Sequence, residues 1–166
     1  MSIVLNTDFT GKYEIAVDQF NETDINLYIA KYEKKFLIQL LGASLYTTFV
    51  ADLVNGVPVT AIYLSIFNSF QIDSTTESIN VSNGMKEMLK GFIYYHYLLD
   101  DPLKSTTVGM VVQKTETYDN VGMNGITNSR YNESVDTYMA IQSYINDNPV
   151  SYPTYNGQEL KYNYFL

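Results

Sequence analysis

His96 is the only histidine of the chain and the first residue that acid–base or metal chemistry would need. It lies within Tyr94-Tyr95-His96-Tyr97, on the apolar stripe of a predicted helix. A catalytic triad needs a nucleophile and an orienting carboxylate beside the histidine, and a zinc site needs further ligands at suitable spacing. No such partner set is evident around His96, and the chain has no cysteine. We therefore interpret His96 as a buried or half-buried structural residue.

Two carboxylate motifs are the remaining candidates for chemistry. Asp100-Asp101 directly precedes Pro102, which is more typical of a helix end than of two carboxylates facing each other across a cleft. Asp119-Asn120-Val121-Gly122 resembles part of a calcium loop, but the later oxygen ligands and the final glutamate are missing, so it is interpreted as a turn. No phosphate-binding loop, dinucleotide fingerprint or nucleophile elbow occurs. The sequence predicts no catalytic residue, no cofactor, no metal site and no enzyme.

Composition limits the classes of partner. The 166 residues fit one domain, and eighteen acidic against ten basic residues give a net charge of −8. Such a chain repels phosphate backbones and anionic lipid, which argues against a nucleic-acid binder or a membrane-surface protein. No long apolar run and no basic leader are present, so neither a membrane span nor a signal peptide is expected. Sixteen tyrosines and eight phenylalanines without tryptophan indicate either contact surfaces or biased codon usage.

Hydrophobic periodicity predicts the elements that hold these residues. Apolar residues at helical spacing begin after Asp24 and continue to Gly42, which is suited to end a helix. Further helices are predicted over 44–53, over 60–70 with Thr60 as cap, over 85–99 and over 129–147, with a turn at 55–58 and a linker at 71–84. The fold class is therefore mainly α: a small bundle of four to five helices with a long irregular or β-ribbon insertion and extended terminal arms.

The predicted organisation has three parts. Residues 1–20 form an N-terminal arm, 21–147 form a helical domain with the insertion at 103–128, and 148–166 form an aromatic C-terminal tail. Val108, Met110 and Val112 alternate with other residues at a period of two, which indicates an extended stretch inside the insertion. The aromatic tail needs a groove to cover it, either on its own domain or on a neighbouring molecule.

The order of several motifs resembles the head–tail connector, or adaptor, proteins of tailed bacteriophages, in the branch found in phages of gut Bacteroidetes. The resemblance runs from about residue 24 to 157. Its motifs are Tyr28-Ile29, Tyr32-Glu33, Phe36-Leu37, Leu40-Leu41-Gly42 and Leu45-Tyr46, then Lys90-Gly91-Phe92-Ile93-Tyr94-Tyr95 with Thr106-Thr107-Val108-Gly109, and finally Arg130-Tyr131-Asn132 and Tyr152-Pro153.

The resemblance implies a virion protein, assembled in the bacterial cytoplasm, that forms a homo-oligomeric and commonly dodecameric ring. Its partners would be the portal protein above it and a downstream tail or connector protein, with DNA passing through the channel without sequence-specific binding and no membrane involved. The resemblance assigns contacts to residues 103–128 and 148–166. The expected interface residues are Val108, Met110, Val112, Tyr118, Tyr152, Tyr155, Tyr162, Tyr164, Phe165 and Leu166. The alternative is a small oligomeric interaction or regulatory module outside the virion.

Overall fold

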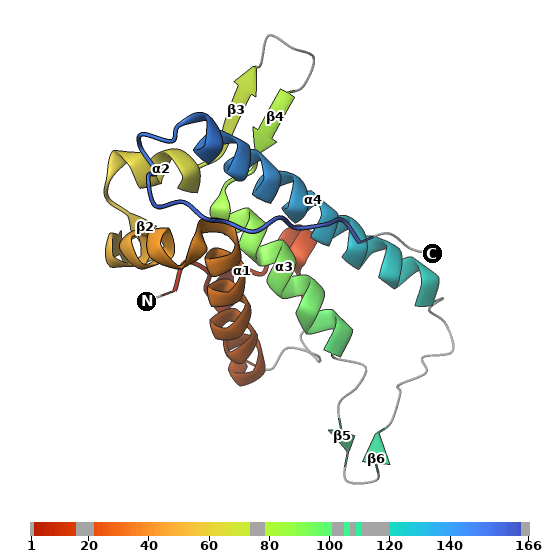
Figure 1. Cartoon of the computed structure of the whole chain (residues 1–166). Helices are drawn as coiled ribbons and strands as arrows, with labels where there is room; N and C mark the ends of the chain where they lie inside the picture. The colour runs from red at the N-terminus through yellow and green to blue at the C-terminus, as the bar shows by residue number, and fades with distance from the viewer. Residues whose placement is uncertain are drawn as a thin grey trace.

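The chain is mainly helical in the computed structural model, which describes residues 2–15, 22–73, 79–100, 105–106, 109–110 and 120–163. Within these residues lie four α-helices, two 3-10 turns and three two-stranded antiparallel ribbons (Figure 1). The helices are α1 (Glu22–Ala51), α2 (Ala61–Phe67), α3 (Met85–Asp100) and α4 (Asn120–Asp147). The 3-10 turns are η1 (Asn6–Asp8) and η2 (Gly11–Tyr13), and the strand pairs are β1 (Leu53–Val54) with β2 (Val57–Pro58), β3 (Phe70–Asp73) with β4 (Ile79–Ser82), and β5 (Ser105–Thr106) with β6 (Gly109–Met110).

Helix α1 consists of two helical segments that meet at a kink. Gly42 has φ of +76° and ψ of 159°, a backbone conformation that is essentially restricted to glycine. The sequence predicts that one helix ends at Gly42 and a second follows at once, and the break at this residue is confirmed. The kink interrupts the helical hydrogen bonds, so the last carbonyl groups of the first segment need partners from elsewhere.

The core lies between α1, α3 and α4 (Figure 1). The rings of Phe36 on α1 and Phe92 on α3 are stacked with centroids 4.0 Å apart, and Tyr131 on α4 meets Phe92 edge-on at 5.2 Å. Helices α3 and α4 approach closely where Gly91 faces Ser134, because a Cβ atom at Gly91 would overlap the Ser134 hydroxyl. The predicted apolar stripes of these helices therefore face one another.

The N-terminal segment belongs to the core, which corrects the expectation of an extended arm for residues 2–15. Its apolar side chains are buried, namely Ile3, Val4, Phe9, Tyr13 and Ile15. Glu33 on α1 holds the start of the segment by accepting hydrogen bonds from the Ser2 hydroxyl at 2.8 Å and the Val4 amide at 2.9 Å, together with the Ile3 amide. The irregular spacing of these side chains follows the 3-10 turns and gives no helical or strand period.

Two further segments differ from expectation. The predicted linker at 71–84 contains the β3–β4 ribbon, with Phe70 paired to Ser82 and Asp73 paired to Ile79. Helix α4 begins at Asn120, nine residues before the predicted start at Ser129, so Asn120-Val121-Gly122 is helical where a turn was predicted. Polar residues and two glycines hide the helical period there. The β5–β6 ribbon lies within the predicted insertion.

Candidate interaction surfaces

Residues 152–163 of the predicted tail run across their own domain and are called the strap (Figure 1). The strap begins on α2, where the buried Tyr152 donates a hydrogen bond from its hydroxyl to the Ile62 carbonyl at 2.7 Å. The sequence leaves open whether the tail docks on its own domain or on a neighbour. For residues 152–163 the structure shows docking on the same chain.

The strap covers the kink of α1. The Gln158 amide donates to the Gln39 carbonyl at 2.7 Å, and the Asn156 amide donates to the Leu41 carbonyl at 3.5 Å. These carbonyls are among the last of the first helical segment, so the strap supplies partners that the kink removes. The backbones approach closely, since a Cβ atom at Gly42 would lie 2.6 Å from the Asn156 carbonyl oxygen. The kink and the strap are therefore structurally interdependent.

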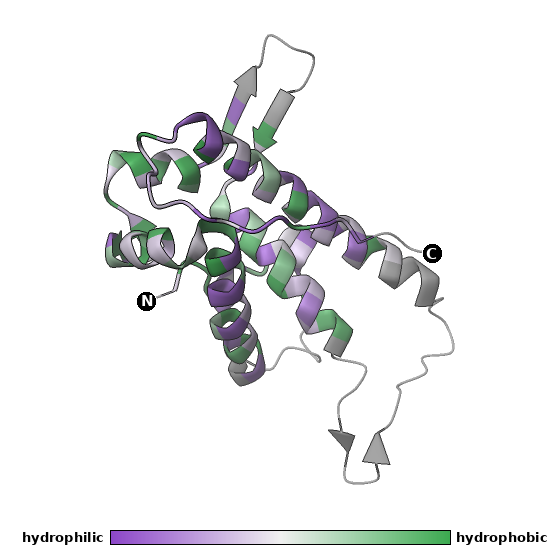
Figure 2. Cartoon of the chain, viewed as in Figure 1, coloured by the Kyte–Doolittle hydropathy of each residue, from purple (hydrophilic) through white to green (hydrophobic). Residues whose placement is uncertain are grey.

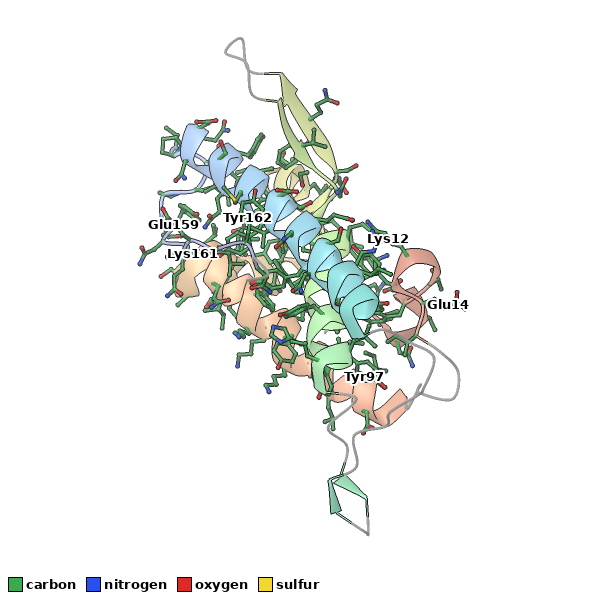
Figure 3. All side chains as sticks on the ribbon, turned by 90° about the vertical axis from the view of Figure 1, so that its right-hand side faces the viewer. Lys12, Glu14, Tyr97, Glu159, Lys161 and Tyr162 are labelled. Atoms are coloured by element: carbon green, nitrogen blue, oxygen red, sulfur yellow. The ribbon has the colours of Figure 1, made fainter. Side chains whose placement is uncertain are left out.

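The rest of the strap is fixed to α4. Tyr138 and Gln142 both donate to the Gln158 carbonyl, at 2.5 and 2.9 Å. Asn163 forms a reciprocal pair with Asn132, donating its amide at 2.9 Å and accepting from the Asn132 side chain at 3.0 Å. The Tyr162 hydroxyl donates to the Asp136 carboxylate at 2.7 Å. Figure 3 shows Tyr162 with Glu159 and Lys161 on one side of α4, while Lys12 and Glu14 lie on the other.

These contacts locate some of the predicted interface residues. Tyr152 is only 3% exposed, so its assignment to an interface is corrected: the ring is part of the core. Tyr155 and Tyr162 are half-buried on the strap, and their predicted contacts with other molecules stay predictions. Met110 lies in β6. The other predicted interface residues lie outside the described residues, namely Val108, Val112, Tyr118, Tyr164, Phe165 and Leu166.

An exposed apolar surface, which sequence reasoning did not assign, lies on the β1–β2 hairpin and the start of α2. We call it the hairpin patch, formed by Val54, Val57, Val59 and Ile62, which are 41–61% exposed. Asn55 and Gly56 both have positive φ, as the tight hairpin turn requires. This turn pairs Val54 with Val57 on the solvent face, while Leu53 and Pro58 are buried. Figure 2 shows apolar residues gathered on this hairpin and on α2. In the sequence, the valines on both sides of Asn55-Gly56 are the signal that could have predicted this exposed hairpin.

His96 is half-buried, as predicted, and lies in an aromatic cluster. Its ring stacks on Tyr32 with centroids 4.0 Å apart and planes 4° from parallel, and Phe36 lies 5.8 Å away. A cavity of about 510 Å³ opens between the N-terminal segment and α1, but His96 is not among the residues that line it. The cavity lining includes Leu5, Asn26, Lys34 and Tyr46. The described residues include no group of three or more side chains suited to hold a metal ion.

Burial raises the pKa of several tyrosines. Desolvation is the largest cause for Tyr138 and Tyr152, whose pKa values lie well above 10, and nearby tyrosines add to the shift. Their protonated hydroxyls are the donors that hold the strap on α4 and α2. The strap therefore depends on neutral phenols. In the described part of the chain, no helix is long and apolar enough to span a membrane.

Comparison with protein-family models, with curated proteins and with solved structures finds no match to the chain.

Proposed function

We propose that the chain is a structural virion protein that forms a head–tail connector ring beneath the portal of a tailed bacteriophage. The ring extends the DNA channel and docks a downstream tail component, without catalysis. In this proposal the helices form a small bundle, the part of the predicted insertion that precedes α4 at Asn120 contains the β5–β6 ribbon, and the protein is assembled into the virion in the bacterial cytoplasm. The order of the sequence motifs supports the proposal, and three of these motifs meet in the core through Phe36, Phe92 and Tyr131.

The hairpin patch is the observation that carries the assembly part of the proposal. Four exposed apolar side chains on one hairpin and the adjoining helix are typical of a surface that another protein covers. The β3–β4 and β5–β6 ribbons leave the helical core at opposite ends (Figure 1). Different surfaces at different ends suit a head-to-tail contact, which closes into a ring when the rotation between copies is constant.

A small oligomeric interaction module outside the virion is the second candidate. The docked strap favours it, because Tyr152 and the neighbouring backbone groups already have partners within one subunit. In this case the hairpin patch would close a small oligomer, and the chain would not bind a portal.

Native mass spectrometry of the full chain, alone and mixed with a portal protein from the same phage, separates the two candidates. The connector proposal predicts rings or a portal complex, and V57Q/V59Q lowers their abundance because it places amides in the hairpin patch. L27Q/V81Q is the matched control, since Leu27 and Val81 are also exposed but lie outside the patch. A small closed oligomer that ignores the portal would overturn the proposal. So would the absence of the chain from purified particles.

A further inference from the structure

Three lysines gather on the outer face of the first half of α1. Lys31, Lys34 and Lys35 are all exposed and lie within five consecutive residues, although the chain has only ten basic residues against eighteen acidic ones. Residues three and four apart on a helix are neighbours on its surface. These side chains therefore form one continuous basic surface, which we call the lysine face.

No lysine of the lysine face forms an ion pair with a carboxylate of the described residues. The described basic side chains with an ion pair are Lys12, Lys86, Lys90 and Arg130, each of which lies within 4.0 Å of a carboxylate. Glu33 lies between these lysines in the sequence, yet it is 7% exposed and accepts its hydrogen bonds from the N-terminal segment. Three neighbouring cations without a carboxylate partner can accept an anion from another molecule.

Aromatic rings lie beneath two of these three cations. The Lys31 ammonium lies 4.9 Å from the Tyr32 ring centre, and the Lys35 ammonium lies 5.4 Å from that of Phe36. Both rings are buried, at 7% and 2% exposure, and His96 stacks on Tyr32 from α3. Leu27 is the only exposed large apolar side chain described on this half of α1. The surface thus offers positive charge with little apolar area.

We propose that the lysine face binds the sugar–phosphate backbone of double-stranded DNA without reading bases. Lysine is a mobile point charge that suits phosphate contacts without fixed geometry. A protein partner would be expected to need an apolar centre, and single-stranded nucleic acid would need exposed rings for stacking, neither of which this face offers. In the proposed connector ring the lysine face would lie in the channel wall, and each copy of the chain would add one weak contact with the DNA. This placement rests on the proposed connector function. The binding itself does not depend on that function.

The charge of the lysine face is opposite in sign to the net charge of the chain. The value of −8 predicts repulsion between the whole chain and DNA, whereas the lysine face is a local exception on one helix. In a ring, acidic surfaces would keep DNA from adhering elsewhere, while the lysine faces would guide it.

The test is a nuclear magnetic resonance titration of the full chain with a short DNA duplex at low ionic strength. We expect shifts of the amide signals around Lys31–Lys35, and a dissociation constant that rises steeply with salt. K31Q/K34Q/K35Q should weaken binding about tenfold or more. It should also lower the logarithmic salt slope by about 2.7, because each phosphate contact contributes about 0.9. K12Q/K86Q/K90Q removes the same charge from ion-paired lysines and should bind as the unmodified chain does.

The remaining outcomes overturn the inference. No shift with DNA, or equal weakening by both triple variants, would show that the lysine face is not a DNA site. A preference for poly-glutamate over DNA would assign the face to an acidic protein instead. Ring formation and portal binding are measured separately from DNA binding. A chain that forms rings but does not bind DNA would overturn this inference and leave the connector proposal intact. A chain that binds DNA but forms no ring would overturn the connector proposal and leave this inference intact.

Discussion

At the scale of single residues, Gly42 joins two features that lie far apart in the sequence. It allows the two halves of α1 to meet at an angle, and its missing side chain leaves room for Asn156 of the strap. A residue with a side chain would be destabilising here for two reasons. Its backbone would be strained at this positive φ, and its Cβ atom would overlap the Asn156 carbonyl. The glycine is thus a requirement of the tertiary structure as well as of the helix end.

We expect G42A to lower the free energy of unfolding by about 2 kcal/mol or more, because alanine strains the backbone at φ of +76° and meets the strap. Urea unfolding followed by circular dichroism measures the change. G125A is the control: Gly125 lies in α4 with no atom within 4 Å of an added Cβ, so alanine should leave stability unchanged or raise it by up to ~1 kcal/mol. Equal effects of the two substitutions would refute the role of Gly42.

At the scale of elements, the strap acts as the cover of the kinked helix. The strap donates backbone amide hydrogens to carbonyls of α1 and accepts hydrogen bonds from side chains of α4, so it connects these two helices. A strap held in this way is sensitive to the loss of one amide group.

Q158P tests this link because proline has no amide hydrogen and leaves the Gln39 carbonyl without its 2.7 Å partner. We expect a loss of about 1–3 kcal/mol in the free energy of unfolding, and faster tryptic cleavage after Lys161. Q158A keeps the amide and should differ little from the unmodified chain. If both variants unfold at the same urea concentration, the amide contributes nothing measurable.

The elements also show how far sequence reasoning reaches. The predicted helices around Phe36 and Phe92 and the break at Gly42 are confirmed, because apolar side chains at helical spacing and a glycine at the end are local signals. The sequence does not predict where the strap docks, because its anchors on α1 are backbone groups, which carry no side-chain pattern. The burial of Tyr13 likewise depends on a contact with a distant segment, at Tyr94 on α3, whereas the start of α4 at Asn120 is hidden by polar residues and glycines that carry no helical period.

At the scale of the whole molecule, buried tyrosines cause the free energy of unfolding to decrease at alkaline pH. Tyr138 and Tyr152 are buried and keep their protons above pH 10, where the same phenols ionise in the unfolded chain. The unfolded chain then binds fewer protons than the folded chain, so stability falls as pH rises. The stabilisation is fully present below pH 10 and is lost above it.

We therefore expect a decrease in the free energy of unfolding above pH 10 of up to about 1.4 kcal/mol per pH unit for each such tyrosine. Urea unfolding at neutral and alkaline pH measures it. Y138F should be less stable at neutral pH, because it loses the hydrogen bond to Gln158, but should lose less on going to alkaline pH. An unchanged pH dependence in Y138F would contradict the assignment.

The strap also sets the timing of folding on the ribosome. Helix α1 is synthesised early, but the amides that complete its bend come from residues 156 and 158, roughly a hundred residues later. At ~5–20 residues per second, the bend waits on the order of ten seconds for its cover. During translation the carbonyl groups at the bend are therefore hydrated by water, and the neighbouring leucines stay uncovered, until the strap has been synthesised.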